Sequence, residues 1–188
     1  VRIPGWAQNQ PVPGNTYTFS DQSNAKFALT INGKSENFKL VNGYAYIVRA
    51  WNKGDIVNLI LPMPIRRVIA IEQIKQDQNR VALQRGPIVY CFEHADNNGK
   101  VMNIAIPDES EFQSSFQPEF LKGVVCLKTQ APVIVLAKDG KSVSTEIKTV
   151  TAIPYYSWAN RGEGQMQIWM PRKIQDIKII ADSAAVAK

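Results

Sequence analysis

The sequence predicts an all-β protein made of two consecutive antiparallel β-sandwich domains. Apolar residues recur with a period of two along most of the chain, which is typical of strands with one buried face. Turn signals, among them Asn32-Gly33 and Asn42-Gly43, separate these runs at short intervals. The 188 residues are 45% hydrophobic and 20% charged, which is ordinary for a globular protein and excludes wholesale disorder.

The first domain is expected to contain four short strands joined as a meander. In the first strand Phe27, Leu29 and Ile31 share a face. A second strand ends at Asn42-Gly43, and a third places Tyr44, Tyr46 and Val48 on one side. In the fourth strand Val57, Leu59 and Leu61 lie together before Pro62 and Pro64, which cannot donate to a central ladder. Trp51 ends the third strand and is predicted to be core.

The second domain is predicted from further apolar runs, with Gly86-Pro87 as a bulge or break in the first of them. These runs span 79–93, 100–107, 123–128, 132–138, 147–156 and 165–171. The segment 108–121 lacks a strand pattern and is predicted to be a long loop pinned by its phenylalanines, because Pro118 interrupts any helix. We place the first domain at 1–70, incomplete at its N-terminus, and the second at 71–188, with a tail that frays after an apolar run at 174–180.

The formal net charge of +6 raises the question of nucleic-acid binding. Such binding requires clustered Lys and Arg that release counterions from phosphates. Here the basic residues are scattered, and Arg66-Arg67 is the one pair of adjacent arginines. No run approaches the roughly 20 apolar residues that cross a bilayer. We therefore expect neither a nucleic-acid partner nor a membrane partner.

No constellation in the sequence indicates catalysis or metal binding. Cys91 and Cys126 lie in apolar runs and are predicted to be buried, reduced thiols. His94, the single histidine, lies in a polar turn and is predicted to be solvated. Ligand-spaced cysteines and a GxSxG elbow are missing. Glu93 ends an apolar strand, and we expect a structural pairing with Arg85 or Arg80. No catalytic, cofactor-binding or metal residue is predicted.

One loop concentrates residues that contact ligands or neighbouring domains. It contains Tyr155, Tyr156, Trp158, Asn160 and Arg161. Aromatic rings with a polar group suit half-wet positions such as domain interfaces, and they also stack on sugar rings. We favour packing at a domain boundary, with Trp158 buried and Arg161 hydrogen-bonded to backbone carbonyls or a carboxylate. A sugar platform is the alternative.

Several segments in order make the sequence similar to a known family. They are "RIPGWA" at 2–7, "NGYAYIVRAWNKGDIVNLILPMPIR" at 42–66, "VALQRGPIVYCFEHADN" at 81–97 and "TAIPYYSWANRGEGQMQIWMP" at 151–171. The chain resembles the C-terminal region of glycoside hydrolase family 127, whose best-known activity is β-L-arabinofuranosidase. The resemblance covers about nine tenths of the chain, from Arg2 to Pro171.

The resemblance implies an N-terminal (α/α)6 barrel followed by two β-sandwich domains. In the family the barrel carries the chemistry: a zinc-bound cysteine is the nucleophile, a glutamate is the acid/base, and zinc is held by cysteines and a glutamate. Adjacent cysteines, a mark of that site, are missing here, and neither Cys91 nor Cys126 matches the nucleophile or a ligand. No catalytic residue is carried over, and zinc is expected in the barrel of the parent enzyme.

The resemblance therefore predicts a non-catalytic region that supports a catalytic barrel and is inactive alone. Its partner would be the barrel of the parent enzyme, which would hydrolyse β-L-arabinofuranosides and lie in the periplasm or be secreted. The alternative is a free-standing carbohydrate-binding module with a plant-type glycan as partner, suggested by the aromatic loop. A catalytic β-sandwich is a third reading, supported only by scattered carboxylates.

Overall fold

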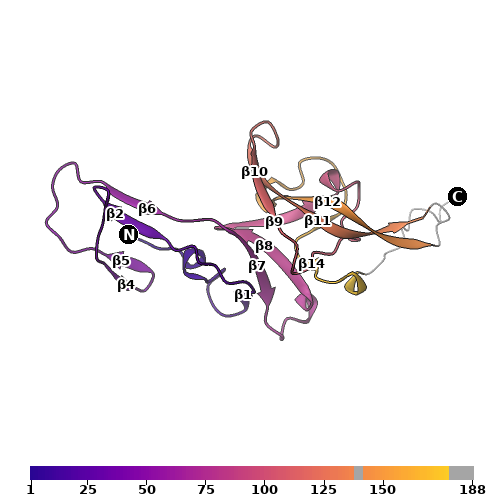
Figure 1. Ribbon diagram of the computed structural model, residues 1–188, viewed down its shortest axis with the longest axis horizontal. Coiled ribbons are helices and arrows are strands. Elements are labelled where there is room, and N and C mark those ends of the chain that lie inside the picture. The colour runs from indigo at the N-terminus through magenta and orange to yellow at the C-terminus, as the bar shows by residue number, and fades with distance from the viewer. Residues whose placement is uncertain (138–141, 178–188) are drawn as a thin grey trace.

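The computed structural model describes residues 1–137 and 142–177 and has two lobes along its long axis (Figure 1). The predicted all-β class is confirmed, with antiparallel sheets and only 3-10 turns as helical elements among the described residues. Those turns are η1 (Gly5–Gln8), η2 (Lys75–Asp77), η3 (His94–Asp96), η4 (Tyr155–Ser157) and η5 (Ile174–Asp176). The predicted fraying of the last residues lies outside the described residues.

The smaller lobe contains two sheets that face one another across a small core. One sheet has the order β3-β2-β6 and the other pairs β4 with β5. The strands are β2 (Ala28–Ile31), β3 (Lys34–Ser35), β4 (Lys39–Val41), β5 (Tyr44–Tyr46) and β6 (Val57–Ile60). The core between them consists of four buried residues: Ile3, Leu29, Ile31 and Ala45. Phe27 packs against it, so the predicted shared face of Phe27, Leu29 and Ile31 is confirmed.

Turn chemistry sets the hairpin of the second sheet. Asn42 and Gly43 have φ angles of 49° and 77°, the left-handed backbone that the predicted Asn-Gly turn requires. The N-terminal residues extend this sheet on the far side of β5. Arg2 forms a bridge with Tyr44, and the Ala45 amide donates to the Val1 carbonyl at 2.8 Å.

The larger lobe is one sheet with the order β1-β7-β8-β9-β12-β11-β10, with β13 on β9 and β14 on β8. Its strands are β1 (Tyr17–Phe19), β7 (Ile65–Ala70), β8 (Arg80–Arg85), β9 (Ile88–Glu93), β10 (Gln113–Gln117), β11 (Val124–Leu136), β12 (Val143–Pro154), β13 (Met166–Gln167) and β14 (Met170–Pro171). Buried residues of β8, β9, β11 and β12 belong to one apolar cluster. The sheet must therefore curve around its own core.

Strands from near both ends of the first predicted domain belong to the sheet of the larger lobe. β1 lies early in the chain, yet it pairs with β7 in the larger sheet, as Thr18 opposite Ile69. β7 also pairs with β8. The larger sheet thus begins with residues before position 70. The domain boundary near residue 70 remains a prediction.

Arg66 fastens the lobes at their junction. Only 6% exposed, it donates to the Asp21 carboxylate at 2.5 Å and to Asn9 at 3.0 Å. Its guanidinium also lies 4.0 Å from the Phe19 ring centre. The neighbouring Arg67 donates to the Ser110 carbonyl at 2.8 Å. The one pair of adjacent arginines in the sequence is therefore used inside the fold.

Four predictions were wrong. The strands of the smaller lobe form no meander, because β2 pairs with β6 in one sheet and β4 with β5 in another. Residues 113–117 form β10 rather than a loop; this edge strand is mostly exposed, so it lacks the apolar alternation that predicts strands. Residues 100–107 form no strand and have one isolated bridge, although Val101 and Ile106 are fully buried. Trp51 is 50% exposed instead of core and lies beneath the Arg49 guanidinium. An apolar run therefore indicated burial, but it did not by itself indicate a strand.

Candidate functional site

The aromatic loop of the larger lobe leaves the sheet directly at the end of β12 and begins with the turn η4. The side chains of Tyr155, Tyr156 and Trp158 are 43%, 68% and 38% exposed. The prediction that Trp158 is buried was therefore wrong. Tyr155 stacks on Trp158, with ring centres 6.0 Å apart and planes 10° from parallel. Within the described residues, the indole is sheltered by its neighbour in the loop rather than by a second element.

Local hydrogen bonds give the loop a defined shape. The Asn160 amide donates to the carbonyls of Ser157 and Trp158, at 3.0 and 3.2 Å. Ala159 between them has a φ of 68°, a left-handed backbone that a non-glycine residue adopts only when its surroundings enforce it. Asn160 therefore braces the turn, and its side-chain amide is committed to that role.

Arg161 ties the loop to the buried end of β9. Its guanidinium donates to both carboxylate oxygens of Asp96, at 2.6 and 2.5 Å, and to the Glu93 carboxylate. It also lies 5.0 Å from the Phe120 ring centre. Glu93 is only 1% exposed. The predicted bond from Arg161 to a carboxylate is thus confirmed.

The expected partners of Glu93 were wrong. Arg80 instead donates to the Trp169 carbonyl at 2.8 Å. Arg161 lies 68 positions away from Glu93 in the sequence, and the fold brings the two together because the loop after β12 returns over β9. The hydrogen bond to Asp96 is the largest of the effects that raise the pKa of Arg161. The guanidinium therefore stays charged at any ordinary pH.

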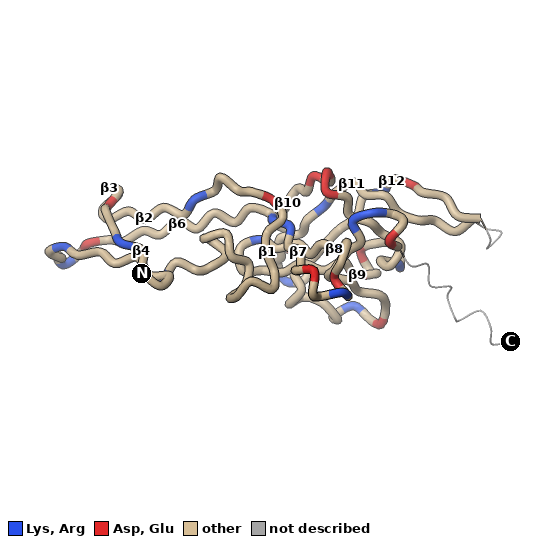
Figure 2. Tube along the Cα trace, turned by 90° about the horizontal axis from the view of Figure 1, so that it is seen from below, with Lys and Arg blue, Asp and Glu red and all other residues tan. Residues whose placement is uncertain are grey.

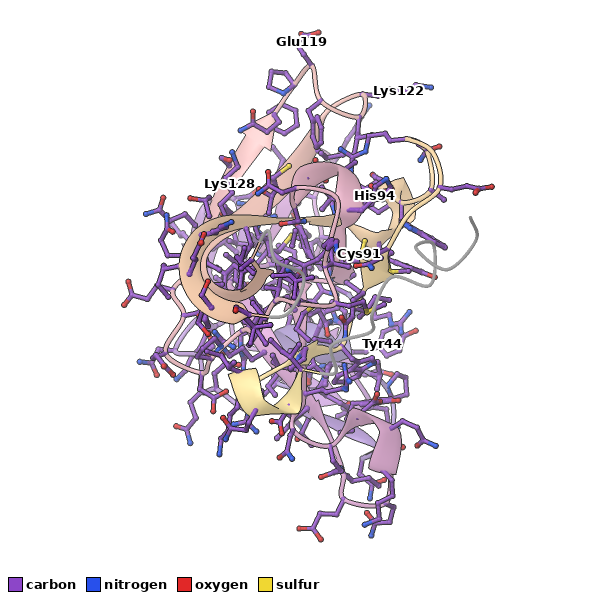
Figure 3. The ribbon with its side chains drawn as sticks, turned by 90° about the vertical axis from the view of Figure 1, so that its right-hand side faces the viewer. Tyr44, Cys91, His94, Glu119, Lys122 and Lys128 are labelled. Atoms are coloured by element: carbon purple, nitrogen blue, oxygen red, sulfur yellow. The ribbon has the colours of Figure 1, made fainter. Side chains whose placement is uncertain are left out.

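The two cysteines are free and buried beneath this network, as predicted. They share an apolar cluster with Val124 and Ile153, and Figure 3 shows Cys91 within the body of the larger lobe. Burial, together with the charges of Glu93 and Asp96, raises the pKa of Cys91 to about 12. Burial also raises the pKa of Cys126. A thiol that keeps its proton at neutral pH is a poor nucleophile and a poor metal ligand.

His94 is less exposed than the polar turn suggested. It begins η3 and is half-buried, with Nδ1 enclosed and without a hydrogen-bond partner. Gly164 packs flat on the imidazole, since a Cβ there would come within 2.3 Å of the ring. The described residues contain no group of three or more His, Cys, Asp or Glu that could hold a metal ion. The expected solvated histidine is thus a packed one.

An open groove crosses the outside of β11 and β12, away from the aromatic loop. Its volume is about 580 Å³. Its lining includes Glu109, Glu111, Lys128 and Ile147. Asp108, next in sequence, forms an ion pair with Arg172, whose hydrogen bond is the main cause of a lowered Asp108 pKa. These carboxylates are solvated or paired, which agrees with their assignment to a polar loop.

The surface charge follows the scattered pattern of the sequence. Lys and Arg alternate with Asp and Glu over both lobes, without a continuous basic stripe (Figure 2). Among the described residues, no helix has the length and apolar character needed to traverse a bilayer.

Comparison with known proteins identifies the class of protein, because both halves of the chain match domains of glycoside hydrolases. The chain belongs to glycoside hydrolase family 127. Residues 1–63 match the "Beta-L-arabinofuranosidase, GH127 middle domain", and residues 65–171 match the "Glycoside hydrolase family 127 C-terminal domain". The predicted family resemblance is therefore confirmed.

Individual relatives agree with the family assignment. The chain is 32% identical over 187 residues to a non-reducing end β-L-arabinofuranosidase of Bifidobacterium longum subsp. longum, covering 92% of this chain and 25% of that protein. A solved family 127 β-arabinofuranosidase is 37% identical, with a TM-score of 0.88 over 94% of this chain and 28% of the other. The family 127 β-L-arabinofuranosidase of Geobacillus stearothermophilus T6 is 36% identical, with a TM-score of 0.75 over 92% and 26%.

The chain thus spans about a quarter of the length of these relatives. The parts it matches are the middle and C-terminal domains. Because the remaining length of the relatives is unmatched, their named activity is not transferred to these 188 residues by similarity alone.

Proposed function

We propose that this chain is the non-catalytic β region of a family 127 enzyme, and that it stabilises an (α/α)6 barrel that hydrolyses β-L-arabinofuranosides. The observation that carries the proposal is the coverage: two β domains match, and they account for about a quarter of enzymes named for that activity. Apolar contact between neighbouring domains stabilises both, which is the role assigned to the β region.

The chemistry of the chain's own residues supports a non-catalytic role. Cys91 lies at 0% exposure, and its pKa is near 12, so no thiolate is available at neutral pH. Cys126 belongs to the same apolar cluster. The residues present therefore do not fit the zinc site of the family, and we derive no step through zinc. In this proposal the metal and the nucleophile belong to the barrel.

The test is to compare the 188-residue chain alone with the complete polypeptide that carries it. We expect the chain alone to hydrolyse no aryl β-L-arabinofuranoside, with or without zinc, whereas the complete polypeptide turns it over. Zinc-dependent hydrolysis by the pure 188-residue chain, lost in Cys91→Ala, would contradict the proposal. So would a complete polypeptide with no arabinofuranosidase activity.

A second candidate function rests on the exposed aromatic loop. Tyr155, Tyr156 and Trp158 are open to solvent while Arg161 anchors their backbone to buried carboxylates. Rigid, half-exposed rings are suited to stacking on sugar faces. A carbohydrate-binding role for a plant-type glycan would appear as retention on arabinan that Trp158→Ala abolishes. If the native chain and Trp158→Ala are retained equally weakly, the loop does not bind the glycan, and a contact with another domain remains as its role.

A further inference from the structure

The outer face of the β4–β5 sheet carries more exposed aromatic and apolar side chains than a solvent-facing sheet surface usually does. Val41 lies directly opposite Tyr44, and Lys39 opposite Tyr46, so these four side chains share one face. The bridge between Arg2 and Tyr44 adds Arg2 to it. Val41, Tyr44 and Tyr46 are 47%, 47% and 56% exposed. We call these five residues the tyrosine face.

Its opposite side is partly buried: Leu40, which lies opposite Ala45, is 43% exposed, whereas Ala45 is packed. Ala45 alternates with the two tyrosines and is 2% exposed, packed with Ile3 against Leu29 and Ile31 of the facing sheet. An antiparallel sheet with one buried face normally presents polar residues on the other. Here the other side presents two tyrosine rings, 6.5 Å apart, and a valine, with Arg2 and Lys39 beside them. The tyrosine face is therefore a half-exposed aromatic surface bordered by two cations.

The facing sheet provides an internal comparison. On β2 and β6 the outward positions include Thr30 opposite Asn58, a polar pair, and Ala28 opposite Ile60. That outer face is mixed, with Ile60 51% exposed beside polar residues. The tyrosine face differs from it in its aromatic rings, which the outward positions of β2 and β6 lack. Val48, two residues beyond the end of β5, is 98% exposed.

We propose that the tyrosine face is the docking surface for the domain that precedes the middle domain in family 127 enzymes. This inference rests on the proposed function, since it names the surface through which the β region would support the barrel. Residues 1–63 match a domain that is called the middle domain of the family, and Val1 is hydrogen-bonded to Ala45 in this sheet. In this proposal, a domain that precedes the middle domain would connect through Val1, at the edge of the tyrosine face.

That connection favours this occupant over a separate partner. A domain tethered at the sheet edge has a high effective concentration next to the face, so even a modest contact forms. Tyr44 projects to one side of the molecule (Figure 3), away from the larger lobe's buried Cys91. Arg2 and Lys39 are both exposed at the rim. We therefore expect an apolar contact on the partner, bordered by Asp or Glu opposite these two cations.

The test is tyrosine nitration with tetranitromethane in the complete polypeptide, followed site by site by mass spectrometry. Half-exposed tyrosines in an uncovered sheet react almost as fast as in the urea-unfolded protein. We expect Tyr44 and Tyr46 to react at least about tenfold more slowly than in urea, as covered side chains do. Rates within about threefold of the unfolded protein would overturn the proposal, because the face would be open.

A variant separates docking from local packing. Tyr46→Glu places a charge in the contact and is expected to raise the nitration rate of Tyr44 about tenfold. Asn58→Glu, on the outward side of β6, is the matched control and is expected to leave that rate unchanged. Equal effects of both variants would contradict docking at this face. Far-ultraviolet circular dichroism checks that both variants keep their strands.

The outcomes keep this inference distinct from the proposed function. A complete polypeptide that hydrolyses arabinofuranosides but nitrates Tyr44 and Tyr46 freely would overturn the docking surface and leave the proposed function standing. Protection that disappears on dilution, together with a dimer mass at high concentration, would assign the face to a second copy and also overturn it. A polypeptide without arabinofuranosidase activity would overturn the proposed function itself.

Discussion

The two lobes are built from the same kind of strand but differ in how much apolar surface they bury for themselves. The larger lobe encloses a cluster drawn from five strands and the segment 101–106, with Tyr90, Phe92 and Leu127 almost completely buried. The smaller lobe has a core of only four buried residues. Its exposed residues include Tyr46, Val48 and Ile56.

Burial of apolar area is the main favourable contribution to folding, so this difference has a thermodynamic consequence. The larger lobe has a core of the size expected for an independent domain. The smaller lobe falls in the range where a separate unit is marginal. We infer that the smaller lobe depends on its neighbours, which are the larger lobe on one side and, by our proposal, a preceding domain on the other.

The largest effect is expected from removing core volume in the larger lobe. Leu127 is 0% exposed on β11, so Leu127→Ala is expected to lower the free energy of unfolding by about 4 kcal/mol. Leu29→Ala, in the thinner core of the smaller lobe, should cost about 2 kcal/mol. Urea denaturation followed by tryptophan fluorescence measures both. A greater loss for Leu29→Ala would reverse our ranking of the two cores.

Ion pairs allow the larger and smaller lobes to be compared through polar groups as well. Arg161→Ala leaves Glu93, whose side chain is 1% exposed, without its cation, and we expect a loss of about 3 kcal/mol. Arg49→Ala removes a pair with Glu36 whose side chains are 27% and 36% exposed, and should cost less than about 1 kcal/mol. Arg161→Ala combined with Glu93→Gln should recover part of the loss. Similar costs for the two arginine variants would show that the Glu93 network is not truly buried.

Alkaline pH should act on the larger lobe, where both cysteines lie. The pKa of Cys91 is raised from 9.0 to about 12 by burial, with Glu93 and Asp96 adding to it. Between these values the unfolded thiol has lost its proton and the folded thiol has not. The free energy of unfolding therefore falls as pH rises from about 9 toward about 12, by up to about 1.4 kcal/mol per unit.

Other groups titrate in the same range, so the contribution of Cys91 is isolated with Cys91→Ala. Urea denaturation at about pH 8 and about pH 10.5 should give a shallower decline for the variant than for the native chain. Parallel declines would mean that the Cys91 thiol ionises as readily in the folded protein as in the unfolded one.

The smallest effect is expected at the exposed aromatic residues. Trp158 is 38% exposed and Trp51 is 50% exposed, so replacing either by alanine should lower the free energy of unfolding by about 1 kcal/mol or less. This prediction replaces the larger cost expected of a buried Trp158. A loss near 3 kcal/mol for Trp158→Ala would mean that the loop packs against the body more closely than its exposure indicates.

The sequence predicted what local patterns control. The alternation of Phe27, Leu29 and Ile31 and the Asn42-Gly43 turn carry their information within a few residues. The edge strand β10 was not predicted, because a strand that is exposed on both faces shows no alternation of apolar and polar residues. The partner of Glu93 is set by how the loop after β12 returns over β9, and no short pattern encodes a contact between residues 93 and 161. The sequence predicted that Arg161 bonds to backbone carbonyls or to a carboxylate, and the fold decides that Asp96 and Glu93 are the partners.

The aromatic loop shows the same limit for the site. Its aromatic density identified it as a surface of interest, yet exposure depends on whether another element covers the rings. Trp158 stacks on Tyr155 and is 38% exposed. Sequence patterns indicate which side chains are able to form a contact, and the fold decides whether one does.

Amide hydrogen exchange tests the dependence of the smaller lobe most directly. The exchange of the 188-residue chain is compared with that of the complete polypeptide, strand by strand. We predict that amides of β2 and β5 in the smaller lobe are protected at least about tenfold more strongly in the complete polypeptide, whereas those of β8 and β9 change little. Equal protection of β2 and β5 in both proteins would show that the smaller lobe needs no neighbour, and would contradict the account.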